Sequence, residues 1–195
     1  LAFLSICAFW QMYDSIVPLI LTKTFHMNET FSGAIMAADN ILALFLLPFF
    51  GSVSDKSHTK IGKRMPFILF GTGCAIILMN ILPLLDNSYA AQPSGFKTAS
   101  FVIVLGLLLV AMGTYRAPAV ALMPDVTPKP LRSRANAIIN LMGAVGGILY
   151  LGVAAVLYPN SKTAGLDHVN YQPLFIVVSA IMFVAVAVLF LTIRE

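Results

Sequence analysis

The feature that most constrains this sequence is a set of six long apolar segments separated by short polar connections. Each segment has roughly the 20 residues that an α-helix needs to cross about 30 Å of hydrocarbon. Because lipid offers the backbone no hydrogen-bond partners, such segments must be helical. We therefore predict an all-α membrane protein, a bundle of six transmembrane helices forming one domain over residues 1–195. The helices are expected near residues 1–22, 31–54, 65–85, 99–123, 134–158 and 172–193.

The composition agrees with a membrane protein. Hydrophobic residues make up 59% of the chain and charged residues only 10%, whereas a soluble domain has about 25% charged residues. The net charge of +4 resides mostly in the connections, so it requires no nucleic-acid partner. Cys7 and Cys74 lie in apolar segments far apart in the sequence, and we expect buried free thiols rather than a disulfide.

The distribution of lysine and arginine predicts the orientation of the helices. The connection 55–64 has four such residues, 124–134 has three, and Arg194 follows the last apolar segment. The opposite connections have three, namely Lys23, Lys97 and Lys162. Since short basic connections stay in the cytoplasm, we expect both chain ends there, in a plasma (inner) membrane.

The polar run from residue 51 to 68 reads G-S-V-S-D-K-S-H-T-K-I-G-K-R-M-P-F-I and contains a third of the lysine and arginine. Its first glycine is expected to allow close helix approach, and Pro66 suits the first turn of the next helix. The glycines, the acid and the basic pair of this run are Gly51, Asp55, Gly62, Lys63 and Arg64.

This run resembles the connection between helices 2 and 3 of the major facilitator superfamily. From Pro48 to Ile68, the pattern P-x-x-G-x-x-S-D-K-x-x-x-K-x-G-K-R-x-P-F-I is similar to its sucrose-transporter and glycoside–pentoside–hexuronide branches. The stretch from Ala119 to Gly143, with A-L-M-P-D and a later A-N, resembles the same branch. The resemblance implies the N-terminal six-helix half of a transporter, built from two inverted three-helix repeats.

Three charged residues fall inside the apolar segments, where an ionisable group usually faces a cavity or a partner. They are Asp14, Asp39 and Arg116, and we expect them to bind substrate or protons. The alternatives are a structural pairing of Asp39 with Asn40 or a neighbouring helix, and an ion pair of Arg116 with Asp125. We add Tyr13, Asn40, Asn136 and Asn140 as further candidate site residues.

Several of these polar and aromatic residues also have a purely structural interpretation. Trp10 and Tyr13 are suited either to stacking on a sugar ring or to helix packing, and Asn136 and Asn140 either to the cavity or to interhelix hydrogen bonds. Gly143 and Gly147 form a G-x-x-x-G pattern, which allows close packing of helices. We further expect residues 86–98 to be polar surface and the last helix to face lipid.

The resemblance implies a sugar:proton symporter, for a glycoside or disaccharide, that works by alternating access. In the family, the acid of the basic connection pairs with basic residues and a helix end, which keeps the inner side closed. That conformational latch would here comprise Gly51, Asp55, Gly62, Lys63, Arg64 and Asp125. The alternative is a basic connection that only determines orientation.

Two departures from the family patterns affect the details. Ala43 and Leu47 stand where sodium-coupled melibiose carriers have aspartates, which favours protons as the coupling ion without excluding sodium. The arginine of the plant sucrose pattern would fall at Val120, one helical turn beyond Arg116. A proton-coupled exporter of drugs or other small molecules and a non-transporting scaffold or receptor remain alternative functions.

The chain has no nucleotide-binding, hydrolase or metalloprotease motif, and its histidines lie in the connections. We therefore expect neither an enzyme nor a cofactor or metal site. The sequence begins within one apolar segment and ends directly after another, so we expect a piece of a longer protein. The expected partners are a small-molecule substrate, the lipid bilayer and a second six-helix half, either a missing C-terminal half or a second copy.

Overall fold

The computed structural model describes every residue except 58, 60, 160–162, 164, 165, 167, 194 and 195. The described part of the chain is helical, with six helices long and apolar enough to cross a membrane. The basic residues Lys60, Lys162 and Arg194, which contribute to the predicted orientation, lie outside the described residues. The helices are α1 (Ala2–Leu19, extended by a π-helical turn Ile20–Thr24), α2 (Glu29–Lys56), α3 (Met65–Ala91), α4 (Gly95–Val126), α5 (Arg132–Leu157, preceded by a 3-10 turn Lys129–Leu131) and α7 (Gln172–Thr192).

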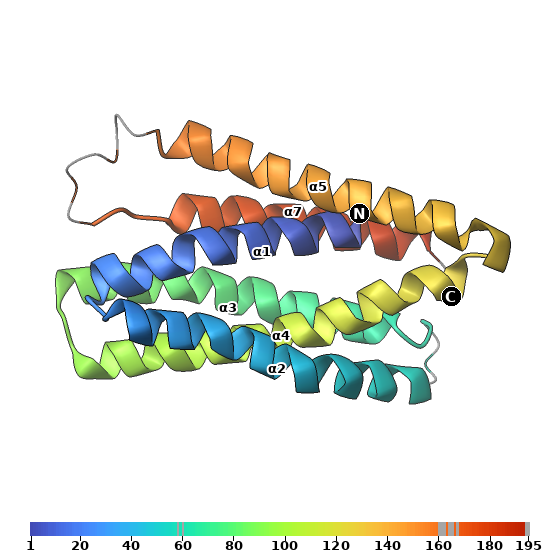
Figure 1. The fold of residues 1–195 in the computed structure, drawn as a ribbon, viewed down its shortest axis with the longest axis horizontal. Coiled ribbons are helices and arrows are strands. Elements are labelled where there is room, and N and C mark those ends of the chain that lie inside the picture. The colour runs from blue at the N-terminus through green and yellow to red at the C-terminus, as the bar shows by residue number, and fades with distance from the viewer. Residues whose placement is uncertain (58, 60, 160–162, 164–165, 167, 194–195) are drawn as a thin grey trace.

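Local sequence features explain where several helices begin. The Asn28 side chain accepts a hydrogen bond of 3.3 Å from the backbone N–H of Thr30, which caps α2. Pro66 occupies the first turn of α3, where a missing N–H is harmless. Consecutive helices are antiparallel, so that the N-terminus and the two basic connections, α2–α3 and α4–α5, lie toward one end of the bundle (Figure 1).

The stretch at residues 86–98 is mostly exposed, as expected, but most of it is helical. Helix α3 continues to Ala91 and α4 begins at Gly95, which leaves only three residues between them. Asp86 is fully buried. The Lys97 ammonium donates hydrogen bonds of 2.7 and 2.9 Å to the carbonyl oxygens of Ser88 and Gln92. The polar composition therefore reflects helix ends that bind one another.

The helices pack in a pattern with internal symmetry. Helix α1 packs on α5, α2 packs on α4, and α3 packs on α4 and α7. If α1, α2 and α3 of the first repeat correspond to α4, α5 and α7 of the second, the α1–α5 pair corresponds to the α4–α2 pair. Helices α1 and α4 also run in opposite directions (Figure 1). This arrangement confirms the predicted fold of two inverted three-helix repeats.

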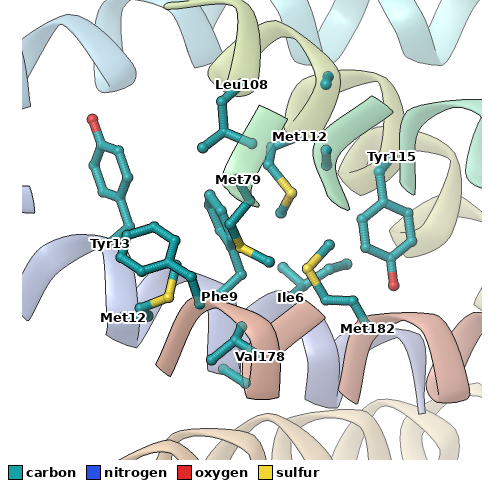
Figure 2. Close-up of a cluster of buried hydrophobic side chains, with 14 of the residues drawn as sticks. Ile6, Phe9, Met12, Tyr13, Met79, Leu108, Met112, Tyr115, Val178 and Met182 are labelled. Carbon is teal, nitrogen blue, oxygen red and sulfur yellow. The ribbon is translucent and has the colours of Figure 1, made fainter. Parts of the chain in front are cut away.

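The core lies where α1, α3, α4 and α7 meet (Figure 2). Met79, Met112 and Met182 come together there from three different helices. The flexible thioether side chain of methionine fills irregular gaps between helices. Phe175 and Val178 of α7 are buried whereas Phe183 and Leu191 are exposed, so one face of the last helix is open to lipid, as expected, and the other packs in the core.

Two glycines allow close contact between helix backbones. A Cβ atom at Gly146 would lie 2.1 Å from the carbonyl oxygen of Leu4, and one at Gly71 would lie 2.7 Å from the backbone nitrogen of Tyr115. Gly143 faces the side chains of α1, but the nearest atom to a Cβ at Gly147 is 3.8 Å away. The G-x-x-x-G pattern therefore predicts close helix packing here, but the second glycine in close contact is Gly146 and not Gly147.

Helices α2 and α5 contribute little to the core. Among the described residues, α2 buries only Ser32 and Ser54, and α5 buries only small glycines and Tyr150. Large side chains of α2, such as Leu44 and Phe45, are exposed. A broad face of the bundle therefore has no partner within the described part of the chain.

Candidate functional site

The central feature of the candidate site is an arginine held against a tryptophan. The guanidinium carbon of Arg116 in α4 lies 5.6 Å from the centre of the Trp10 ring in α1, which is a cation–π geometry. Asp39 of α2 lines the same small cavity. Within the described residues, no ion pair joins Asp39 to Arg116, and neither Asp39 Oδ1 nor Trp10 Nε1 has a hydrogen-bond partner. The site therefore presents unused polar atoms inside the bundle.

Trp10 lines both this cavity and a second, larger opening. The small cavity's volume of about 20 Å³ suits about one water molecule. Trp10 also lines an open groove of about 410 Å³ between α1 and α5, together with Gln11 and Asp14. Trp10 thus shares the small cavity with Asp39 and Arg116 and the groove with Asp14, and we call these four residues the Trp10 group. The sequence left sugar stacking and helix packing open for Trp10, whereas Gln11 is a site residue that our sequence interpretation missed.

Tyr13 does not occupy the position that we expected. Its side chain is fully buried, it stacks on Phe9 with ring centres 6.1 Å apart, and it contacts Trp10 edge to face at 5.4 Å. Its ring is part of the core cluster in Figure 2. Tyr13 therefore cannot stack on a sugar in this conformation, and the partly exposed aromatic ring beside Asp14 is that of Trp10.

The three asparagines lie apart from the Trp10 group. Asn136 and Asn140 line a separate apolar cavity of about 270 Å³ with Val120, and the Asn140 amide donates to the Asn136 carbonyl at 3.0 Å. Asn40 is exposed on α2 and lines neither the cavity nor the groove beside Trp10. The structure therefore does not bring these three residues together with Arg116.

A second polar site lies at the end of the bundle where α2, α3 and α4 approach. Arg64 is nearly buried and donates from Nε to Asp125, from one terminal nitrogen to Asp55 at 2.6 Å, and from the other to Ser54 Oγ at 3.0 Å. Asp125 is thus engaged by Arg64 and not by Arg116. We call Ser54, Asp55, Arg64 and Asp125 the Arg64 network. Ser54 is a member that sequence reasoning missed.

The remaining predicted latch residues have different positions. Gly62 has a φ of 114°, a conformation that glycine adopts readily, and its N–H donates to the Thr59 carbonyl at 3.1 Å. Lys63 is exposed and makes no ion pair with any described residue. A Cβ at Gly51 would have no atom within 4 Å, so the expected close helix approach there is wrong.

The Arg64 network combines a buried cation with partly exposed anions. The side chain of Arg64 is 9% exposed, whereas those of Asp55 and Asp125 are 60% and 48% exposed. Charge-assisted hydrogen bonds are strong when dry, but water competes at exposed carboxylates and reduces the net gain to about 1 kcal/mol or less per pair. Such a network can hold the ends of α2, α3 and α4 together, and its contacts can still break and form again.

Comparison with known proteins identifies the family. The family model described as Major Facilitator Superfamily matches residues 1–195. The chain belongs to this superfamily. It is 34% identical over 158 residues to sucrose transport protein SUC3 of Arabidopsis thaliana, a match that covers 75% of the chain and 26% of that protein. It is also 34% identical over 154 residues to sucrose transport protein SUT3 of Oryza sativa subsp. indica, covering 72% and 30%.

These relatives confirm the predicted resemblance to the sucrose-transporter branch of the superfamily. Sucrose transport protein SUT4 of Oryza sativa subsp. indica is 29% identical over 154 residues, covering 72% of the chain and 25% of that protein. The chain therefore matches about a quarter to a third of the length of these curated relatives. No solved structure gives a significant match.

Proposed function

We propose that this chain is the N-terminal six-helix half of a secondary transporter that moves a sugar together with protons by alternating access. The observation that carries this proposal is the Trp10 group, because it holds polar atoms without partners inside a bundle of membrane-spanning helices. Two curated relatives that are 34% identical to the chain are named sucrose transport proteins, which favours a glycoside or disaccharide as the substrate.

The exposed face of the bundle supports the need for a second half. Asp14 of α1, Asn40 of α2 and Asn140 of α5 are all exposed in this chain. Polar groups at membrane depth are costly against lipid but are stable when they face a water-filled cavity. A second six-helix half, or a second copy, placed against α2 and α5 would convert this face into such a cavity.

Each member of the Trp10 group has a distinct proposed role. The planar guanidinium of Arg116 donates hydrogen bonds to sugar hydroxyl groups, and the exposed part of the Trp10 ring stacks on the sugar. Asp14 lies in the open groove, so it exchanges a proton with water on the side to which the cavity opens. Asp39, with a free oxygen beside Arg116, accepts a further hydroxyl or a water molecule.

The Arg64 network is proposed to act as the latch of the transport cycle. Its members come from α2, α3 and α4, so separating these helix ends must break the contacts of Arg64. The exposed carboxylates make that separation inexpensive in free energy. The orientation that we predict from lysine and arginine places this network in the cytoplasm.

The test is uptake of radiolabelled sucrose and other sugars into proteoliposomes that contain the full-length protein, with an imposed inward proton gradient. We expect gradient-dependent accumulation of a sugar and its loss in the Asp14→Asn variant. Glu29→Gln is a matched control, because it neutralises an exposed acid in the first turn of α2 and should leave uptake unchanged. Failure of the folded protein to accumulate any sugar would refute the symporter assignment, and extrusion of a lipophilic dye would support an exporter instead.

A further inference from the structure

A buried carboxylate lies at the end of the bundle opposite the Arg64 network. Asp86, near the C-terminal end of α3, is fully buried, and neither of its oxygens has a hydrogen bond within the described part of the chain. An ionised carboxylate that is buried without hydrogen bonds costs several kcal/mol. Such a group is stable only when it is neutral or when a cation lies close to it.

The neighbour that can provide the positive charge is a histidine from the stretch that precedes α7. The Nε2 atom of His168 lies 3.8 Å from Asp86 Oδ2 and 2.8 Å from the side-chain oxygen of Asn87. The Nδ1 atom of His168 lies 3.3 Å from the hydroxyl of Thr24 at the end of α1. One imidazole therefore joins the ends of α1 and α3 to the beginning of α7.

The hydrogen bonds around the ring show which nitrogen changes its protonation. The Asn87 amide nitrogen donates to the side-chain oxygen of Asn170 at 2.9 Å, so the other end of that amide, its oxygen, faces His168 and accepts from Nε2. Nε2 therefore keeps its hydrogen in both states of the ring. Nδ1 accepts from the Thr24 hydroxyl when neutral and donates to it when protonated, because a hydroxyl can do either.

The His168 ring is partly accessible to water and shares its cavity with a lysine. The side chain of His168 is 27% exposed and lines a cavity of about 640 Å³. Lys23 from the end of α1 and the aromatic hydroxyl groups of Tyr158 and Tyr171 line the same cavity. On the α4 side, Lys97 is occupied by backbone carbonyls. Asp86 is thus the carboxylate that faces the ring among the described residues.

We propose that Asp86 and His168 form a proton-binding site, separate from the Trp10 group. This site holds the stretch before α7 against the ends of α1 and α3. A proton from the water of the cavity binds Nδ1, and the resulting imidazolium neutralises the Asp86 carboxylate. Loss of that proton leaves the carboxylate buried without a counter-ion, so the stretch from His168 to Tyr171 separates more easily from α1 and α3. Histidine suits this role because it ordinarily changes charge between pH 5 and 8.

The first test is nuclear magnetic resonance of the protein with ¹⁵N-labelled histidine in nanodiscs, over pH 5.5 to 8.0. The chain has three histidines, and His26→Asn and His168→Asn identify two of the signals. We expect the His168 nitrogen signals to change over this range and to change differently in Asp86→Asn, which removes the charge and keeps the shape. A His168 signal that does not titrate, or one that titrates identically in Asp86→Asn, would overturn the proposal.

The second test does not require Asp86→Asn to fold. We expect the melting temperature of the protein, relative to that of His168→Asn, to be about 2–4 °C higher at pH 5.5 than at pH 8.0. The matched control is His26→Asn, since His26 is exposed, has a positive φ that asparagine tolerates, and makes no ion pair with a described residue. An equal pH dependence in His168→Asn and the unmodified protein would contradict the proposal.

Discussion

The contact between α1 and α5 makes a sharp prediction for Gly146. Its alanine variant would place a carbon 2.1 Å from the Leu4 carbonyl oxygen, whereas an ordinary carbon–oxygen contact is about 3.3–3.6 Å. The two backbones must therefore separate by roughly 1 Å, because neither atom is part of a flexible side chain. Overpacking of this kind costs about 1–3 kcal/mol.

The measurement is thermal unfolding of the purified protein in detergent. One kcal/mol corresponds to about 2–4 °C for a chain of this size, so we expect Gly146→Ala to lower the melting temperature by about 2–12 °C. Gly147→Ala is the matched control, because the nearest atom to its Cβ would be a side-chain oxygen 3.8 Å away. Alanine should stabilise the helix slightly at that position.

The comparison of the two adjacent glycines decides the outcome. Equal melting temperatures for Gly146→Ala and Gly147→Ala would show that α1 and α5 are not in contact at Leu4. A larger loss for Gly147→Ala would mean that the two helices meet on the face that the G-x-x-x-G pattern predicts. Either result would refute the packing described above.

The remaining predictions concern two tyrosines and the Arg64 network. Tyr115→Phe removes a hydroxyl that lies 2.7 Å from Ser5 Oγ and should lower the melting temperature by about 2–4 °C. Tyr13→Phe, by contrast, removes a buried hydroxyl without a partner among the described residues and should cause no loss; equal losses in both variants would contradict this. Arg64→Lys keeps the charge but cannot reproduce the forked contacts to Asp125, Ser54 and Asp55. It should lower the melting temperature by about 2–4 °C and slow uptake by the full-length protein, and unchanged values of both would exclude a latch.

The six helices could be predicted from sequence because a membrane helix must satisfy its own backbone hydrogen bonds. Length and apolarity therefore determine each helix almost independently of its neighbours. The boundaries were less predictable where a polar residue binds another helix end, as Lys97 does. A polar residue in an isolated sequence gives no indication of whether its partner is water or protein.

The candidate site could be predicted only in part for a related reason. Buried charge in a membrane is rare enough that Asp39 and Arg116 could be selected from sequence alone. The face on which an aromatic residue lies depends on how its helix is rotated, which neighbouring helices determine. The sequence therefore could not distinguish Trp10, which lines both cavities, from Tyr13, which is in the core.

The interleaved pairing of the helices has a consequence for how the protein is made. Each of α1 and α2 has its main packing partner in the second repeat, α5 and α4 respectively. During synthesis both helices must therefore enter the bilayer before their packing partners have been translated. Their own apolarity keeps them inserted during that time, but their polar residues lack partners until the later helices arrive. A ribosome that stops after α3 would leave an assembly intermediate open to quality-control proteases, so the two repeats must mature together.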